Sequence, residues 1–146
     1  MSSDETKYVR FSNRISDKLE NKDYLHYNDI DEWCKDNQYI EKYYRKSNRD
    51  WYYYISSLFR LHNETINIWT HLLGFIGVLF SCIYVNENYN VSKYKSQSLC
   101  FNIFTVCMMC CYLFSSIMHL LYPKSEKCCI NTQFLDYTGI NLLIAG

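Results

Sequence analysis

Two long apolar stretches without a formal charge dominate the hydrophobic pattern of this 146-residue chain. The first covers residues 66–84 and the second covers residues 98–122. Each reaches the roughly 17 to 25 residues that cross a hydrocarbon core about 30 Å thick. A third apolar stretch begins at residue 134 and has 13 residues up to Gly146. The pattern predicts an all-α membrane protein, a transmembrane helix bundle whose third span, 134–146, is incomplete.

The short third stretch sets an expectation about the chain as a whole. A helix that stopped in mid-membrane would leave backbone carbonyls without hydrogen-bond partners, each at a cost of several kcal/mol. We therefore expect the sequence to be a fragment, a truncated gene product, or one part of a bundle that another chain completes.

Charge is distributed very unevenly along the chain. Of its 30 charged residues, 21 lie in the first fifty positions. A soluble bundle that buried the two apolar stretches would need amphipathic partner helices, and this charged part offers few apolar faces, so we expect the spans to lie in a lipid bilayer. The net charge is zero and no long basic block occurs, which argues against a nucleic-acid partner.

The part before the first span divides into segments of different character. Residues 1–50 read as a cytosolic polar tail, mobile up to about residue 25. Within it, residues 31–45 suit a short helix that either packs on the membrane or another part of the protein or stays solvated. Residues 51–65 place aromatic and apolar side chains at helical spacing, which predicts an interfacial amphipathic helix leading into the transmembrane region, 66–146.

The basic residues that flank the first span predict its orientation. Five lie before it, whereas the loop after it holds two. Because basic residues favour the cytosolic side, the N-terminus is predicted to be cytosolic. The chain is then an integral, multi-pass protein of the plasma membrane or an endomembrane. The five are Lys42, Arg45, Lys46, Arg49 and Arg60, and the two are Lys93 and Lys95.

Polar residues at the start of the first span have assignable local roles. Asn63 can cap the helix, and Glu64 falls in its first turn, where the helix dipole favours an anion. Asn67 and His71 share one face, which we expect to meet other helices because lipid cannot satisfy polar groups.

Three polar residues near the end of the second span and the start of the third form a candidate site. Ser115 and His119 lie one helical turn apart, and Asp136 follows a short loop. An imidazole beside a carboxylate is a common arrangement at metal sites. The alternative is a structural histidine that is hydrogen-bonded to Asp136.

The sequences "SLFRLHNETINIWTHLLGF", "SSIMHLLYPKSEK" and "LDYTGINLLIAG", in this order, resemble the progestin and adipoQ receptor family, which includes haemolysin-III-like proteins. The likeness is strongest to its adiponectin-receptor branch, to whose lead-in "DEWCKDNQYIEKYYR" is weakly similar, although "YYRKS" departs from the family pattern. The resemblance implies a seven-span bundle with a cytosolic N-terminus. This chain would then be its N-terminal portion, truncated within the third span.

The resemblance also implies a chemistry. In the family a zinc ion is held by a histidine that matches His119 and by two histidines of an H-x-x-x-H motif in the last span. Asp136 matches an aspartate that contacts the zinc-bound water, Ser115 matches a serine that lines the site, and His62 and His71 match positions that are not ligands. The family site is associated with hydrolysis of the amide bond of ceramide-like lipids. No H-x-x-x-H follows position 119 here, so this chain supplies one zinc ligand.

Three functions remain open from the sequence. The first is a zinc-dependent lipid amide hydrolase once the bundle is complete. The second is a receptor or membrane adaptor whose cytosolic tail binds partners and whose zinc is only structural; a protein ligand and a second copy of the chain both remain open as partners. The third is an inactive fragment.

Overall fold

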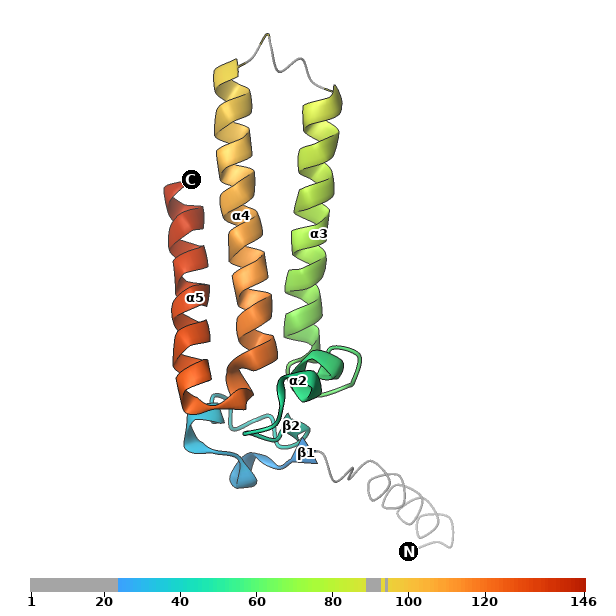
Figure 1. The fold of residues 1–146 in the computed structure, drawn as a ribbon, viewed down its shortest axis with the longest axis vertical. Helices are drawn as coiled ribbons and strands as arrows, with labels where there is room; N and C mark the ends of the chain where they lie inside the picture. The colour runs from blue at the N-terminus through green and yellow to red at the C-terminus, as the bar shows by residue number, and fades with distance from the viewer. Residues whose placement is uncertain (1–23, 89–92, 94) are drawn as a thin grey trace, which may run out of the picture.

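Three long helices standing side by side make up most of the fold (Figure 1). The computed structural model describes residues 24–88, 93 and 95–146, so the predicted mobile tail falls almost entirely outside the described residues. Helix α3 is Thr65–Asn88, helix α4 is Lys95–Leu121 and helix α5 is Glu126–Ala145. Helix α4 packs against both of the others. The shorter elements gather at the base of the bundle, where α3 begins and α4 ends.

The two predicted complete spans lie in helices of sufficient length and hydropathy to cross a membrane. The first candidate span is Thr65–Asn88 and the second is Lys95–Lys124, which includes the 3-10 turn η3 at Tyr122–Lys124. Both expose large apolar side chains over most of their length, which suits contact with lipid. Examples are Leu73, Phe80, Leu99 and Val106.

Helix α5 begins well before the predicted start at residue 134. Ser125 caps it at the N-terminus, because its Oγ accepts a hydrogen bond from the backbone N–H of Cys128 at 3.2 Å, and Glu126 lies in the first turn. A cap and a polar first turn carry no apolar signal, so the apolar pattern placed the start too late.

The predicted helix over residues 31–45 is wrong. These residues form the 3-10 turn η2, Glu32–Cys34, and the strand β2, Tyr44–Arg45. Strand β2 pairs antiparallel with β1, Tyr24–Leu25, and a further 3-10 turn, η1, lies at Tyr27–Asp29. Tyr43 has a φ of 70°, a left-handed backbone conformation that a continuous α-helix excludes.

The predicted interfacial helix is shorter than expected. Helix α2 covers Trp51–Ser57, and Asp50 caps it by accepting a hydrogen bond from the Tyr53 N–H at 2.7 Å. Residues 58–64 then turn the chain into α3. Aromatic and aliphatic side chains of this region stay exposed, which suits the headgroup zone of a membrane. They include Trp51, Tyr52, Ile55, Phe59 and Leu61.

The buried apolar cluster of the described chain lies at the base of the bundle. It brings the N-terminal segment together with the junction between α4 and α5. The residues before α2 are therefore packed onto the helices. The cluster consists of Ile30, Cys34, Tyr44, Tyr122 and Cys129.

Arg45 joins this N-terminal segment to the end of α4. Its guanidinium is buried, and it donates hydrogen bonds to the backbone carbonyls of Leu120 at 2.8 Å and His119 at 2.6 Å and to Ser57 Oγ at 2.9 Å. The last carbonyls of an α-helix have no partner within the helix, so Arg45 satisfies two of them.

Small residues allow the long helices to approach closely. A Cβ atom added at Gly139 of α5 would lie 2.8 Å from the backbone Cα of Cys111 in α4. Between α3 and α4, Ser116 Oγ donates to the carbonyl of Ile68 at 2.9 Å. Small side chains and interhelical hydrogen bonds are the usual means by which helices associate in lipid.

Replacing Gly139 by alanine should destabilise the bundle by roughly 1 to 3 kcal/mol, because the new methyl group meets backbone and forces α4 and α5 apart. The free energy of unfolding, measured by denaturant titration in lipid micelles, provides the test. Gly77→Ala is the matched control, since its added Cβ meets nothing within 4 Å, and it should stabilise α3 by up to about 1 kcal/mol. Equal effects of the two substitutions would contradict the tight contact.

Replacing Arg45 by methionine should loosen the N-terminal segment from the bundle. The substitution leaves two buried carbonyls without donors, at a cost of roughly 1 to 3 kcal/mol each. Backbone hydrogen exchange at residues 44–57 should accelerate at least about tenfold, the factor that corresponds to about 1.4 kcal/mol. Lys42→Met, which removes an exposed cation of the same segment, should leave the exchange rate unchanged.

Candidate functional site

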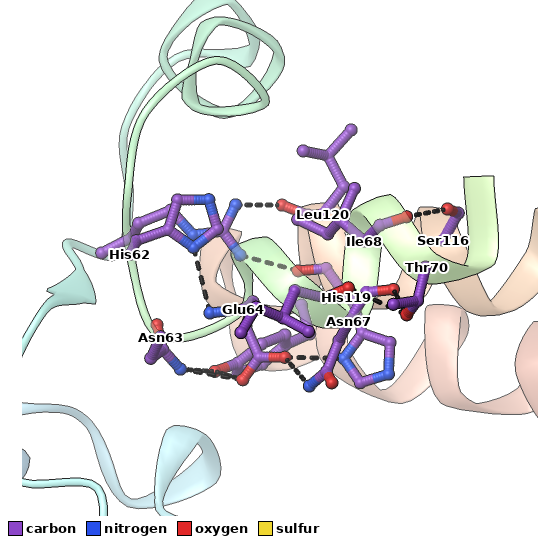
Figure 2. A network of polar contacts seen from close by, with 12 residues as sticks. His62, Asn63, Glu64, Asn67, Ile68, Thr70, Ser116, His119 and Leu120 are labelled. Carbon is purple, nitrogen blue, oxygen red and sulfur yellow. Dashed lines mark hydrogen bonds and ion pairs between the residues drawn. The ribbon is translucent and has the colours of Figure 1, made fainter. Parts of the chain in front are cut away.

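The carboxylate of Glu64 lies at the centre of a polar network where α3 begins (Figure 2). The residue is only 3% exposed. Its Oε1 accepts a hydrogen bond from Asn63 Nδ2 at 2.8 Å and has Tyr122 Oη at 3.4 Å. Its Oε2 accepts from Asn67 Nδ2 at 2.8 Å and lies 2.7 Å from Nδ1 of His119. The network thus links the turn before α3, the first turn of α3 and the end of α4.

The surroundings of Glu64 favour its charged form. Burial raises the pKa of the carboxyl, but hydrogen bonds from His119 and Asn67 and the nearby charge of Arg45 outweigh burial, so the pKa lies below its ordinary value. Glu64 is therefore an anion at neutral pH and accepts hydrogen bonds through both oxygens.

His119 is held at its ring and at its backbone. The ring contacts Glu64 through Nδ1, and the carbonyl of the same residue accepts a hydrogen bond from Arg45 Nη2 at 2.6 Å. With Nδ1 occupied, Nε2 is the ring nitrogen that can bind a metal ion or a substrate. A carboxylate on the second nitrogen is the usual companion of a zinc-bound histidine.

His62 lies in the same network but is a neutral, structural group. Its Nδ1 accepts a hydrogen bond from the Glu64 N–H at 3.1 Å. Burial, aided by the nearby Arg45 guanidinium, lowers the pKa of His62 to about 3. Its imidazole therefore stays uncharged at neutral pH and supports the turn that carries Glu64.

His71 and Asp136 lie deeper along the helices. The ring centroid of His71 is 5.8 Å from that of His119, and its Nδ1 is buried with no hydrogen-bond partner in the described part of the chain. Asp136 of α5 is half-buried and close enough to His71 to interact with it electrostatically. Ser115 is buried in α4, one turn before His119. The structure therefore places His71 beside His119, and Asp136 lies within electrostatic range of His71.

The alternative in which His119 is hydrogen-bonded to Asp136 is not what the structure shows. The partner of His119 is Glu64, which lies 55 positions earlier in the sequence. The sequence pattern predicts only that Glu64 complements the dipole of α3 and that Arg45 indicates the cytosolic side of the membrane. A signal for Glu64 was present, since an ionisable residue at the edge of a span calls for a partner. For Arg45 no such signal is present in the sequence.

The fit of these residues to zinc is partial. In residues 24–88 and 95–146, no three His, Cys, Asp or Glu side chains gather closely enough to hold a metal ion. His119 nevertheless meets the requirements of a single ligand, with one nitrogen fixed by a carboxylate and the other available. The described residues therefore fit one position of a zinc site and do not complete it.

Comparison with known proteins places the chain in a family. The model of the haemolysin-III-related family matches residues 59–146. An adiponectin receptor protein of Drosophila melanogaster is 33% identical over 121 residues, covering 83% of this chain and 27% of the relative. The membrane progestin receptor beta of Homo sapiens is 35% identical over 108 residues, covering 74% of this chain and 30% of the relative.

A third relative carries the family's name. Progestin and adipoQ receptor family member 3 of Mus musculus is 39% identical over 130 residues, covering 82% of this chain and 39% of the relative. The chain thus spans between 27% and 39% of the length of these three curated relatives. With its family match and its two long apolar helices, the chain belongs to the haemolysin-III-related, or progestin and adipoQ receptor, family of multi-span integral membrane proteins, which includes membrane receptors.

Proposed function

We propose that this chain is part of a zinc-dependent hydrolase that cleaves the amide bond of ceramide-like lipids, with His119 as one metal ligand. The observation that carries the proposal is the pairing of His119 Nδ1 with the buried carboxylate of Glu64 at 2.7 Å. This pairing leaves Nε2 free to bind a metal, as in other carboxylate–histidine zinc sites.

The position of His119 in the bundle suits a lipid substrate. It lies in the last turn of α4, where the exposed apolar surface of the long helices meets the polar network around Glu64. A ceramide-like lipid has its amide group just below the headgroup and its hydrocarbon chains in the membrane core. Its scissile bond would therefore reach the depth of His119 without leaving the bilayer.

Zinc, when bound, would lower the pKa of a water ligand towards about 7 and polarise the amide carbonyl. Asp136 would accept a hydrogen bond from the attacking water and orient it. Ser115, one turn from His119, would line the same site. The remaining ligands would come from protein beyond the residues described, consistent with the greater length of the relatives.

The base of the bundle would face the cytosol. Basic residues cluster before α3, whereas at the other end of α3 and α4 the sequence has Lys93 between the two helices and Lys95 at the first position of α4. The anionic cytosolic leaflet attracts such residues. Hydrolysis would therefore take place at the cytosolic boundary of the membrane.

A receptor or adaptor in which zinc is only structural is the second candidate. It is favoured by the names of relatives, which describe receptors for adiponectin and progestins. In that case the network around Glu64 would hold the bundle together, and an extracellular or lipid ligand would act on its arrangement.

Asp136→Asn distinguishes the two candidates. In the complete protein it should reduce the hydrolysis of a fluorescent ceramide at least about 100-fold, because positioned acid–base groups contribute roughly 10² to 10⁴ to such rates. Zinc content, measured by elemental analysis, should not change, since the carboxylate acts on water rather than on the metal.

Asp29→Asn is the control, because it makes the same chemical change at an exposed position outside the long helices. It should leave both hydrolysis and zinc content unchanged. Hydrolysis that persists in the Asp136→Asn protein would refute the catalytic role of this residue. Zinc binding with no hydrolysis in the unmodified protein would favour the receptor.

A further inference from the structure

Three groups other than His119 hold the carboxylate of Glu64 in place. Asn63 and Asn67 each donate an amide N–H to one of its oxygens, and Tyr122 approaches the first of them. These three groups come from the turn before α3, from α3 itself and from η3. Because donors already point at both oxygens, the carboxylate presents only lone pairs to its fourth neighbour.

That fourth neighbour is Nδ1 of His119. A neutral imidazole carries one proton, which can sit on either ring nitrogen. A nitrogen that lies 2.7 Å from an acceptor-only oxygen must carry the proton, since two lone pairs would otherwise face each other. The other nitrogen, Nε2, then has the lone pair that a metal ion requires.

Resting on the zinc function proposed above, we propose that Glu64 is a positioning residue that selects the ligand tautomer of His119. Its role is to keep the proton on Nδ1 so that Nε2 is always ready to bind the metal. It would not touch zinc, water or substrate. Glu64 thereby gains a function beyond its place at the start of α3.

Arg45 completes the positioning from the backbone side. Its bond to the carbonyl of His119 fixes the height of the last turn of α4, while Glu64 fixes the direction of the ring. Both groups come from residues before the first span, so the N-terminal segment determines how a ligand on the second span is presented. Misplacement of a ligand by even about 1 Å is costly in metal and catalytic sites.

The tautomer can be measured without any metal. The full chain, labelled with ¹⁵N-histidine and reconstituted in lipid nanodiscs, gives separate nitrogen signals for protonated and unprotonated ring positions. The four histidines are assigned by single replacement, with His119→Gln identifying the one of interest. We expect His119 to carry its proton on Nδ1. A proton on Nε2, or equal populations of the two tautomers, would overturn the proposal.

Glu64→Gln tests whether the carboxylate is the cause. The amide that replaces it has one NH₂ group, which must face either His119 or the donors of Asn63 and Tyr122, so the preference for Nδ1–H should fall at least about tenfold. Glu87→Gln is the matched control, since it removes an exposed glutamate near the other end of the same helix. It should leave the His119 tautomer unchanged. Glu64→Leu removes the acceptor in every orientation, so an unaltered tautomer in both the Glu64→Gln and the Glu64→Leu chains would overturn the proposal.

Titration with Zn²⁺ separates this proposal from the function on which it rests. In the unmodified complete protein the Nε2 signal of His119 should shift, and Glu64→Gln in the same protein should weaken the apparent affinity about 10-fold to 100-fold, as expected for loss of a group that orients a metal ligand. If Zn²⁺ leaves the His119 signals unchanged while the tautomer is as expected, zinc ligation fails and the role of Glu64 in setting the tautomer stands. If Zn²⁺ shifts Nε2 equally in both chains, the role of Glu64 fails and zinc ligation stands.

Discussion

The carboxylate of Glu64 is almost completely buried at the point where the first span begins, and an anion in such a place must be surrounded by donors. Those donors belong to three separate pieces of the chain: the turn before α3, the first turn of α3, and the region from the end of α4 into η3. They meet around one carboxylate only when α4 ends beside the start of α3. The need to satisfy this charge therefore sets the relative height of the first two spans, which apolar contacts in lipid would leave less well defined.

In the N-terminal segment a buried cation, Arg45, likewise joins separate pieces of the chain through its hydrogen bonds. The end of α4 presents carbonyls without intrahelical partners, and the Arg45 guanidinium supplies donors for two of them while it remains buried. Tyr54 strengthens this junction by donating from its hydroxyl to the carbonyl of Lys46 at 2.8 Å. Residues before the first span are thus part of the bundle's structure. They supply hydrogen-bond donors to carbonyls that the end of α4 would otherwise leave unsatisfied.

The parts of this fold that the sequence predicts are those governed by one-dimensional rules. Apolar length alone identifies the spans within α3 and α4, because a bilayer of fixed thickness demands it. The early start of α5 was not predicted, because Ser125 and Glu126 begin the helix through capping and not through an apolar pattern. A helix was wrongly predicted over residues 31–45 because apolar residues from several short turns pack into one cluster, and their spacing in the sequence resembles that of a helix. The pairing of Glu64 with His119 depends on two residues 55 positions apart, a distance over which the pattern has no information.

The candidate site has different surroundings on the two sides of His119. On the side of Glu64, both carboxylate oxygens have hydrogen-bond partners, and one of these contacts holds the His119 ring, which keeps a ligand in a defined orientation. On the side of α5, the buried Nδ1 of His71 has no hydrogen-bond partner within residues 24–88 and 95–146, and Asp136 is only half-buried. Such groups cost free energy until a substrate, a water molecule or a further helix satisfies them. Function in this bundle is therefore expected on the α5 side of His119, where its chemistry is still available, while the opposite side serves to hold it still.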